Sequence, residues 1–393
     1  MNETIEKESL NAVTEDIFDA EQYNKPPLTA GKIVLRCFIA FFTVLFLLVI
    51  GVYLTLLSIA RGPSETVRNM LVLSARQASA TKWMPQLFLD EETINEIYEN
   101  SDKITVDVMS AEEYAEKNKA DNETQGVVVE DEWDGASDGM VLKIENGSTY
   151  KAYVLLVKDP SRVFVGTSSD NYDNATIGMD IFNVVERYDA IAGINGGEFL
   201  DKGGVGTGAK PMGLTYSCGT CVWNEALRRT FIGFDSNDRL VVSESMSYAQ
   251  ANALGIRDAV SFQTGNVLID SVDGNISFHY EDSNTGTAQR TAIGQREDGT
   301  VIMIVTDGRT ASSIGATHND MINLMIKYGA VNAAMLDGGS SAMLYFENYF
   351  DVFPGFDYSR LDTYQQRGLV NKYQAFSSPR TIPTFFLVRR EAE

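Results

Sequence analysis

The chain has 393 residues, 44% of them hydrophobic, and a formal net charge of −22. That is enough apolar material for one large or two medium folded domains with an appendage. The acidic balance argues against a nucleic-acid-binding protein, which needs a basic face, and against docking on anionic lipid by charge.

The N-terminal part of the chain predicts a membrane anchor. Residues 1–31 are polar and acidic, and we expect a disordered tail. Residues 37–60 carry no charged side chain and are numerous enough to cross a bilayer as a helix, so residues 32–61 are predicted to be a transmembrane signal anchor. The apolar run is longer than a typical signal-peptide core, and no clear cleavage site follows it. Lysines and arginines flank it almost equally, so charge alone does not set its orientation.

Residues 62–125 are predicted to form a stalk. Apolar residues recur at helical spacing over residues 65–83, a second short helix is expected over residues 93–98, and an acidic polar stretch covers residues 111–124. The change to strand-like sequence near Val127 marks the expected start of one domain, residues 126–393.

Strand patterns dominate that domain. Apolar runs predict strands over residues 150–157, 163–165, 191–194, 230–234, 240–242, 265–269, 300–306 and 330–336, and helices are expected over residues 180–188 and 317–328. Strands and helices do not alternate regularly, which disfavours a doubly wound fold. We therefore expect an α+β domain of large mixed β-sheets with flanking helices. His318 is expected on the exposed side of its helix.

Three of the expected strands end in a polar side chain beside glycine. The first ends in Asn195, Gly196, Gly197 and Glu198; the second in Asp307, Gly308 and Arg309; the third in Asp337, Gly338, Gly339, Ser340 and Ser341. Each alone is consistent with an ordinary turn, since Asp, Gly and Ser are common turn formers. Glycine also lets the backbone approach a ligand closely.

These strand ends bring together groups suited to glycoside cleavage. Glu198, Asp307 and Asp337 provide carboxyl groups for a general acid and for a nucleophile or base. Arg290 and Arg309 are candidate anion binders, because a guanidinium meets a phosphate with parallel hydrogen bonds. No GxSxG segment is present, so a Ser-His-Asp hydrolase is disfavoured.

The cysteines and acidic residues define no cofactor site. Cys218 and Cys221 form a CxxC between strand-like runs, expected to be a small structural disulfide or two free thiols at a hairpin. With two histidines in the chain, a zinc site has little support. No metal or other cofactor is predicted, although clustered Asp and Glu leave a divalent cation open.

Together, the three strand ends resemble the phosphodiester glycosidase family. That family has an INGGFF-like segment, a P-x-G step, an RTAIG strand followed by DGR, an LDGGGSS strand end and a late Pro-Arg. The matching residues here are 194–199, 211–213, 290–294, 307–309, 336–341 and 379–380, within residues 127–390. Two departures are Glu198, where the family has an aromatic or small residue, and one glycine fewer after Asp337.

The resemblance implies an extracytoplasmic hydrolase that cleaves an N-acetylglucosamine-type sugar-1-phosphodiester in cell-envelope or exopolysaccharide metabolism. It is held by a single-pass anchor at residues 37–60, with the tail of residues 1–31 in the cytoplasm. The resemblance also implies catalytic carboxyl groups on Asp337, Asp307 and Glu198. The substrate-binding residues that it implies are Asn195, Gly196, Gly197, Arg290, Thr291, Arg309, Gly338, Gly339, Ser340, Ser341 and Arg380.

Two other functions remain open from the sequence. A non-catalytic module could hold a phosphate-bearing wall or capsule polymer in the same cleft. Glu198 keeps this reading open, because a changed site residue can accompany lost or altered activity. A glycosidase acting on a polymer without phosphate is the third reading, and it predicts that the arginines are dispensable. In each case the partner is a carbohydrate, with no role for nucleic acid.

Overall fold

The computed structural model describes residues 29–76, 81–101, 103–124, 133, 136, 138–201, 206–282, 286–308, 310, 313–347, 349, 361–373 and 378–391. The chain divides into two compact units, Met1–Ile59 and Ala60–Glu393. Nearly all of the predicted N-terminal tail, up to residue 28, lies outside the described residues.

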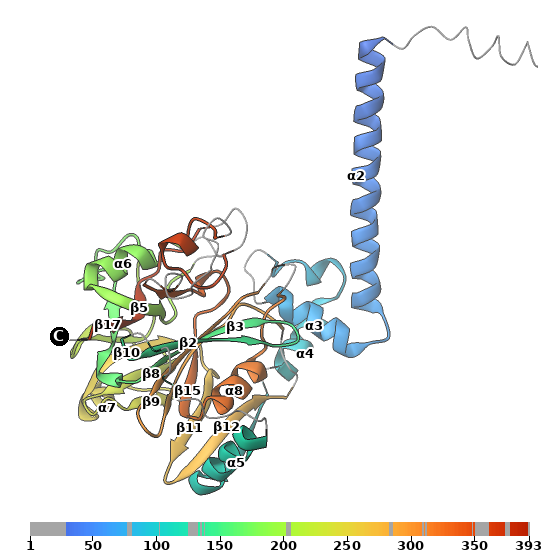
Figure 1. The fold of residues 1–393 in the computed structure, drawn as a ribbon. Coiled ribbons are helices and arrows are strands. Elements are labelled where there is room, and N and C mark those ends of the chain that lie inside the picture. Colours follow the sequence, from blue (N-terminus) through green and yellow to red (C-terminus); the bar gives the residue numbers. More distant parts are fainter. Residues whose placement is uncertain are drawn as a thin grey trace, which may run out of the picture. The chain divides into compact units, whose positions relative to one another are not determined.

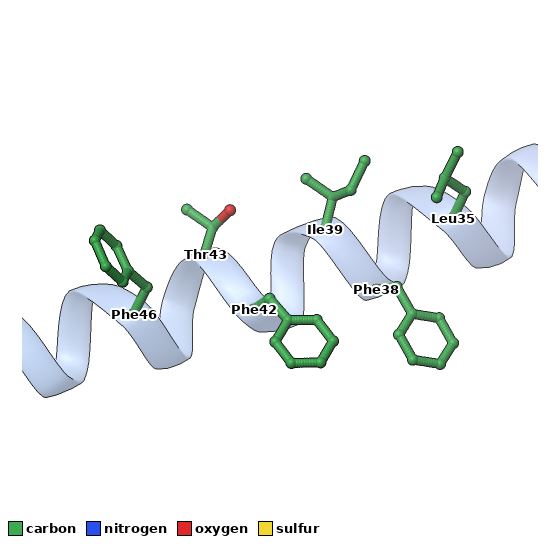
Figure 2. A pocket seen from close by; sticks show the side chains of 6 residues that line it. All are labelled: Leu35, Phe38, Ile39, Phe42, Thr43 and Phe46. Atoms are coloured by element: carbon green, nitrogen blue, oxygen red, sulfur yellow. The ribbon is translucent and has the colours of Figure 1, made fainter.

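Helix α2 (Ala30–Arg61) accounts for the described part of the first unit (Figure 1). Figure 2 shows a stretch of it in which apolar side chains and one hydroxyl project from a single helix, around a shallow groove lined by Leu35, Phe38, Ile39, Phe42, Thr43 and Phe46. A 32-residue helix is about 48 Å long, more than the roughly 30 Å of a bilayer's hydrocarbon core. Within the described residues, α2 alone combines this length and apolar character.

The second unit is built on three antiparallel sheets. In spatial order, the eight-stranded sheet contains β1 (Ile104–Ser110), β12 (Asn275–Glu281), β11 (Val267–Val272), β15 (Ala330–Leu336), β13 (Thr291–Arg296), β14 (Val301–Thr306), β3 (Lys151–Val157) and β2 (Met140–Asn146). The five-stranded sheet contains β7 (Thr220–Asn224), β6 (Leu214–Ser217), β10 (Ile256–Phe262), β8 (Thr230–Asp235) and β9 (Leu240–Ser243). The four-stranded sheet contains β16 (Leu344–Phe346), β5 (Ala190–Asn195), β17 (Thr384–Arg389) and β4 (Val163–Thr167).

Helices flank these sheets, and the expected α+β class is confirmed. The described strand pairs are antiparallel and not mixed, because strand direction depends on how the loops return the chain, which an apolar pattern does not record. The helices of this unit are α3 (Glu65–Arg76), α4 (Glu91–Ser101), α5 (Ala111–Thr124), α6 (Ile181–Tyr188), α7 (Tyr248–Ala253) and α8 (His318–Lys327). Short 3-10 turns are η1 (Pro85–Leu87), η2 (Pro160–Arg162), η3 (Gly339–Ser341) and η6 (Gln365–Arg367). Most of the strands and helices predicted from apolar runs are present, with bounds shifted by a few residues.

The apolar runs form strands because both faces of the central sheet are covered. Every residue of β14 is buried, as a continuous apolar strand requires. Helix α8 covers part of one face with the buried Met321 and Met325. It begins at a capping box between Thr317 and Asp320, in which each side chain bonds the other residue's main-chain N–H.

The expectation that His318 is exposed was wrong. The residue is 2% exposed, and its Nε2 lies 3.1 Å from the carbonyl oxygen of His279 on β12. Burial, with a smaller effect from Arg290, lowers the pKa of His318 to about 4. The helical pattern alone did not reveal that β12 covers this side of α8.

The segment predicted to be a stalk contributes to the main sheet. Residues 104–110 form β1, which pairs with β12 along its whole length. Helix α5 follows, and its buried Tyr114 donates a hydrogen bond of 2.9 Å to the carbonyl oxygen of Ala330 at the start of β15. The acidic residues of this segment face solvent while a few apolar side chains pack, so composition alone suggested a spacer.

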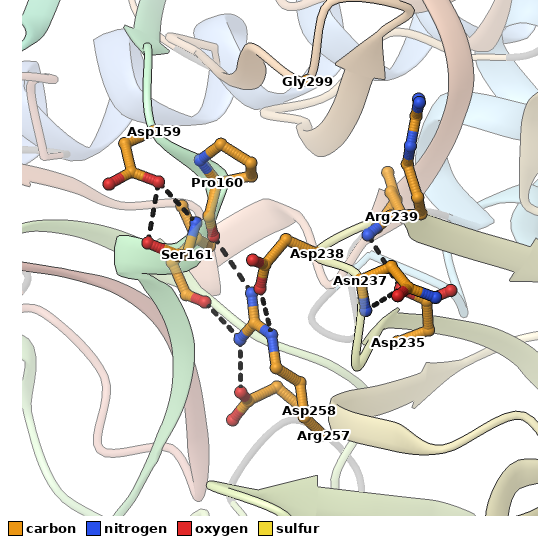
Figure 3. Close-up of polar contacts among 12 residues, drawn as sticks. Asp159, Pro160, Ser161, Asp235, Asn237, Asp238, Arg239, Arg257, Asp258 and Gly299 are labelled. Carbon is orange, nitrogen blue, oxygen red and sulfur yellow. Dashed lines mark hydrogen bonds and ion pairs between the residues drawn. The ribbon is translucent and has the colours of Figure 1, made fainter.

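One arginine joins the four- and five-stranded sheets (Figure 3). Arg257 on β10 donates to Asp258 at 2.6 Å, to Asp238 in the β8–β9 turn at 2.8 Å, and to main-chain oxygens of Pro160 and Val163 at 3.0 and 2.7 Å. The buried Asp258 also accepts the N–H groups of Val165 and Cys218, each at 2.9 Å. These bonds satisfy a buried ion pair and hold β4 against β10.

Candidate active site

Four neighbouring strands of the large sheet begin or finish at the same end of that sheet. Strands β15 and β14 finish there while β13 and β3 begin, since Thr291 pairs with both Leu336 and Val305, and Thr306 pairs with Ala152. Asp337 and Asp307 are therefore the first residues after β15 and β14, on either side of β13. Neighbouring strands are about 4.8 Å apart, so the Cα atoms of Asp307 and Asp337, two strand spacings apart, are separated by roughly 10 Å.

The end of β5 in the four-stranded sheet contacts this end of the large sheet at Asp337. The Asp337 N–H donates to the carbonyl oxygen of Gly196 at 3.2 Å, and Asn195 Nδ2 donates to the Asp337 carbonyl oxygen at 2.6 Å. Asn195 Oδ1 accepts from the Thr291 hydroxyl at 2.8 Å and from the Met343 N–H at 3.2 Å. Both Asn195 and Thr291 are fully buried. Their side chains therefore lock the two sheets together and hold Asp337 in place.

The Asp337 carboxyl group is partly buried and has an unusual pKa. Burial raises the pKa of Asp337 to about 6, while the Ser341 hydroxyl, the Arg380 charge and the Gly338 N–H partly oppose the rise. The charge of Glu198 raises it slightly further. A carboxylic acid with a pKa in this range can carry a proton near neutral pH and release it during a reaction.

The glycines of the site permit close main-chain packing. A Cβ on Gly196 would lie 2.5 Å from the Thr384 hydroxyl oxygen, and one on Gly197 would lie 2.3 Å from the Ser261 carbonyl oxygen. Gly339 has a φ of +59°, which side chains other than glycine rarely adopt. The N–H groups of Gly196, Gly197, Gly338 and Gly339 all have protein acceptors. These donors build the site instead of pointing unpaired at a ligand.

Arg380 is the cation beside Asp337. It precedes β17, and its guanidinium donates to Asp201 at 3.0 Å, to the Gly206 carbonyl oxygen at 3.2 Å and toward the Ser340 hydroxyl at 3.5 Å. The guanidinium also lies over the ring of Phe199, 4.9 Å from its centroid. A partly exposed guanidinium held on several sides is suited to bind a phosphate in a defined orientation.

Glu198 is close enough for its charge to affect Asp337, and it forms an ion pair with Arg229. Its carboxylate accepts from Arg229 Nε at 2.5 Å, and its N–H donates to the Ser261 carbonyl oxygen at 2.8 Å. Burial raises the pKa of Glu198, and the charge and hydrogen bond of Arg229 act against that rise. Burial therefore raises the pKa of both carboxyl groups, and a neighbouring arginine opposes the rise in each case: Arg229 at Glu198 and Arg380 at Asp337.

Asp307 has a different environment. It is 5% exposed and accepts the Tyr153 hydroxyl at 3.0 Å and the Lys372 N–H at 3.1 Å. Burial raises its pKa, and the hydrogen bond from Tyr153 opposes this. Asp307 thus fixes the main chain at residue 372, next to Tyr373, a residue of the site to which no sequence pattern points.

Tyr373 reaches the Asp337 turn from that fixed segment. Its hydroxyl donates to the carbonyl oxygen of Ser340, and burial raises its pKa, with Arg380 and Asp337 both close enough to affect it. The neighbouring Asn371 is buried and bonds the main chain at Ala342 and Leu344. No local motif surrounds these residues, so only the folded chain reveals them.

The other two predicted anion binders are Arg290, which bonds main-chain oxygens of the protein, and Arg309. Arg290 donates from Nε to the Ala316 carbonyl oxygen at 3.2 Å and from Nη2 to that of Gly286 at 3.0 Å, which ties the start of β13 to the approach to α8. Arg309 falls outside the described residues. Of the predicted anion binders, Arg380 is the one that the structure places beside Asp337.

No metal centre is formed by the part of the chain that the structure describes. It contains no group of three or more His, Cys, Asp or Glu side chains arranged to hold an ion. Cys218 and Cys221 are free thiols in the β6–β7 hairpin, in agreement with the second of the two expected readings. Cys218 Sγ accepts from Arg389 at 3.2 Å.

Comparison with known proteins identifies relatives of this domain. Residues 188–389, just over half of the chain, match a family described as phosphodiester glycosidase. A prophage-derived uncharacterized protein of Bacillus subtilis, YomE, is 41% identical over 76 residues, which are 19% of this chain and 12% of that protein. The present chain therefore covers only a small part of this curated relative.

Solved structures of similar proteins differ considerably from this chain in sequence. The zebrafish N-acetylglucosamine-1-phosphodiester alpha-N-acetylglucosaminidase catalytic domain, auto-inhibited by its pro-peptide, is 16% identical with a TM-score of 0.48, covering 64% of this chain and 82% of that one. A hypothetical protein from Synechocystis is 14% identical with a TM-score of 0.41, covering 64% and 63%.

Proposed function

This chain belongs to the phosphodiester glycosidase family, and from that premise we propose that it hydrolyses a sugar-1-phosphodiester and releases the sugar from its phosphorylated partner. The observation that carries the proposal is Asp337: a carboxyl group with a pKa of about 6, at the junction of two sheets, with a guanidinium on one side and a second carboxyl group nearby. This arrangement supplies a proton, a negative charge and an anion-binding group together.

The environments of the two carboxyl groups suggest their roles. Asp337, with the raised pKa, acts as the general acid that protonates the oxygen of the departing phosphate. Glu198, ion-paired with Arg229, acts as the nucleophile or as the base that activates water. The pair follows the usual division between one protonated and one ionised carboxyl group in glycoside cleavage.

Arg380 holds the phosphate in this proposal. Its guanidinium is oriented by Asp201 and by the ring of Phe199. Binding the charged diester there places the bond between the sugar and the phosphate beside Asp337. Asn195, Thr291 and Asp307 act as positioning residues, because their side chains are buried and bonded to the protein around Asp337 and Tyr373.

We place the enzyme on a membrane, with the hydrolase domain outside the cytoplasm and α2 as a single-pass anchor. The length, apolar composition and all-round exposure of α2 support this placement. An anchored hydrolase of this class fits a role in cell-envelope or exopolysaccharide metabolism, with a carbohydrate phosphodiester as substrate.

The proposal is tested with the full chain in detergent or nanodiscs. An aryl diester of N-acetylglucosamine-1-phosphate is the substrate, and the Asp337→Asn variant is the control. Release of free sugar by the wild type and not by the variant supports the proposal. A folded wild-type protein that releases no sugar from this or related sugar-1-phosphodiesters contradicts it.

The ion pair between Glu198 and Arg229 favours one second candidate. With its carboxylate engaged by an arginine, Glu198 could serve only to shape a binding site for a phosphate-bearing polymer. This non-catalytic module predicts that the wild type and Asp337→Asn bind such a polymer equally and that neither releases sugar.

A further inference from the structure

Gln289 lies between the two carboxylate turns. It precedes Arg290 just before β13, the strand that separates β14 from β15 in the sheet. Its carbonyl oxygen accepts the Gly339 N–H at 2.8 Å. It is thus in direct contact with the turn that follows Asp337, and strand order places it equally near the turn that follows Asp307.

Two glycines allow Gln289 this central position. A Cβ on Gly338 would lie 2.7 Å from the Gln289 carbonyl oxygen, and a Cβ on Gly308 would lie 2.8 Å from its main-chain nitrogen and 3.2 Å from its Cγ. Real Cβ atoms essentially never come within 3.0 Å of such atoms. The glycine after each aspartate is therefore required by the packing of Gln289 between the turns.

The side chain of Gln289 contains a buried acceptor with no partner. The residue is 6% exposed, and Oε1 is buried without a hydrogen bond in the part of the chain that the structure describes. Leaving a buried polar atom unpaired costs about 1–3 kcal/mol, so such atoms are few in folded proteins. At the centre of a candidate active site, the missing partner points to a ligand.

Gln295, on the strand that follows Gln289, provides the contrast. It is 2% exposed, and its Oε1 accepts the Leu240 N–H at 2.7 Å while Nε2 donates to the carbonyl oxygens of Asp238 and Gly299 at 2.8 and 3.0 Å. A structural glutamine in this sheet is thus fully bonded, unlike Gln289.

We propose that Gln289 binds the sugar of the substrate, with Oε1 accepting a hydrogen bond from a sugar hydroxyl or an acetamido N–H. This inference rests on the proposed function and adds the orientation of the substrate. A phosphodiester is an anion with no proton to donate, so an unpaired acceptor cannot recognise it. The phosphate therefore lies toward Arg380, and the sugar lies over the start of β13 between the two turns.

The test compares Gln289→Met with Gln295→Met in the full chain. Methionine keeps nearly the same length and volume and removes the amide. For Gln289→Met we expect an unchanged or higher Tm, because an unpaired buried acceptor is removed, and an increase in KM of about tenfold. For Gln295→Met we expect a lower Tm and an unchanged KM.

A series of substrates, each lacking one sugar hydroxyl or the acetamido group, identifies the contact. One analogue should react more slowly than the complete substrate with the wild type. With Gln289→Met the same analogue and the complete substrate should react equally fast, because the variant has already lost that hydrogen bond. Equal penalties in both proteins for every analogue would overturn the inference while leaving the proposed function intact.

The Tm comparison is independent of activity. A Tm for Gln289→Met that falls as far as that of Gln295→Met would mean that the Gln289 amide is a structural group, and the inference would be wrong. A wild type without activity on any of these substrates would instead contradict the proposed function, and with it the sugar contact.

Discussion

Two strands of one sheet, β14 and β15, are each followed by the same dipeptide, Asp-Gly, and the two aspartates have different surroundings. Asp307 is bonded by the Tyr153 hydroxyl and the Lys372 N–H. Asp337 has the Gly338 N–H on its carboxyl group, the Ser341 hydroxyl and the Arg380 charge nearby, and a pKa of about 6. One turn anchors a neighbouring segment, and the other presents an acid. The motif sets where a carboxyl group stands, and its partners decide what it does.

The largest expected effect is that of Asp337→Asn. Removal of the general acid should lower kcat by about 10³-fold. The variant should be at least as stable as the wild type at pH 7–8, because a raised pKa means that the ionised carboxylate costs folding free energy there. Steady-state kinetics and thermal unfolding measure both effects. An active Asp337→Asn variant would remove the distinction between the two turns.

Arg380→Gln should have the next largest effect. Loss of a charged hydrogen-bond donor to the phosphate should increase KM by about 30-fold. A sugar linked to a neutral aryl group, without phosphate, serves as the comparison substrate. If Arg380→Gln affected both substrates equally, or neither of them, Arg380 would not be the phosphate ligand, and a glycosidase acting on polymer without phosphate would be favoured.

The pH dependence of the wild type should follow Asp337. A general acid must be protonated, and Asp337 loses its proton as pH rises through about 6. We therefore expect kcat/KM to fall about tenfold per pH unit above that value. The folding free energy contributed by Asp337 should be complete below pH 3.8 and lost as pH rises through about 6. A rate that instead rises through pH 6 would make Asp337 the base or nucleophile.

Asp307→Ala should have the smallest effect on activity and a clear effect on stability. Removing the carboxylate leaves the Tyr153 hydroxyl and the Lys372 N–H without their acceptor, which should lower the unfolding free energy by about 2 kcal/mol. We expect kcat/KM to fall less than tenfold through displacement of Tyr373. The decrease of kcat/KM above about pH 6 should be retained in the pH–rate profile. Loss of that decrease in Asp307→Ala, measured by the same pH–rate series, would assign the acid to Asp307.

The sequence predicted more of the fold than of the site. Strands with continuous apolar residues, such as β14, and the capped helix α8 were recognisable because local pattern and burial agree. Helix α5 was missed because an acidic surface helix has a weak apolar pattern. Strand β1 was missed although Ile104, Val106 and Val108 alternate with polar residues as in a strand. The exposed placement predicted for His318 failed because β12 covers it.

By itself, the sequence determined the α+β class, the apolar helix α2 and the set of strand ends that carry Asn195, Asp307 and Asp337. Tertiary structure alone decided the surroundings of these residues. Asn195 bonds the main chain of Asp337 across 142 positions, Arg229 pairs with Glu198 across 31, and Asp307 holds Lys372 across 65. A pKa or a hydrogen-bond partner depends on groups that approach only when the sheets pack, and no local pattern records them.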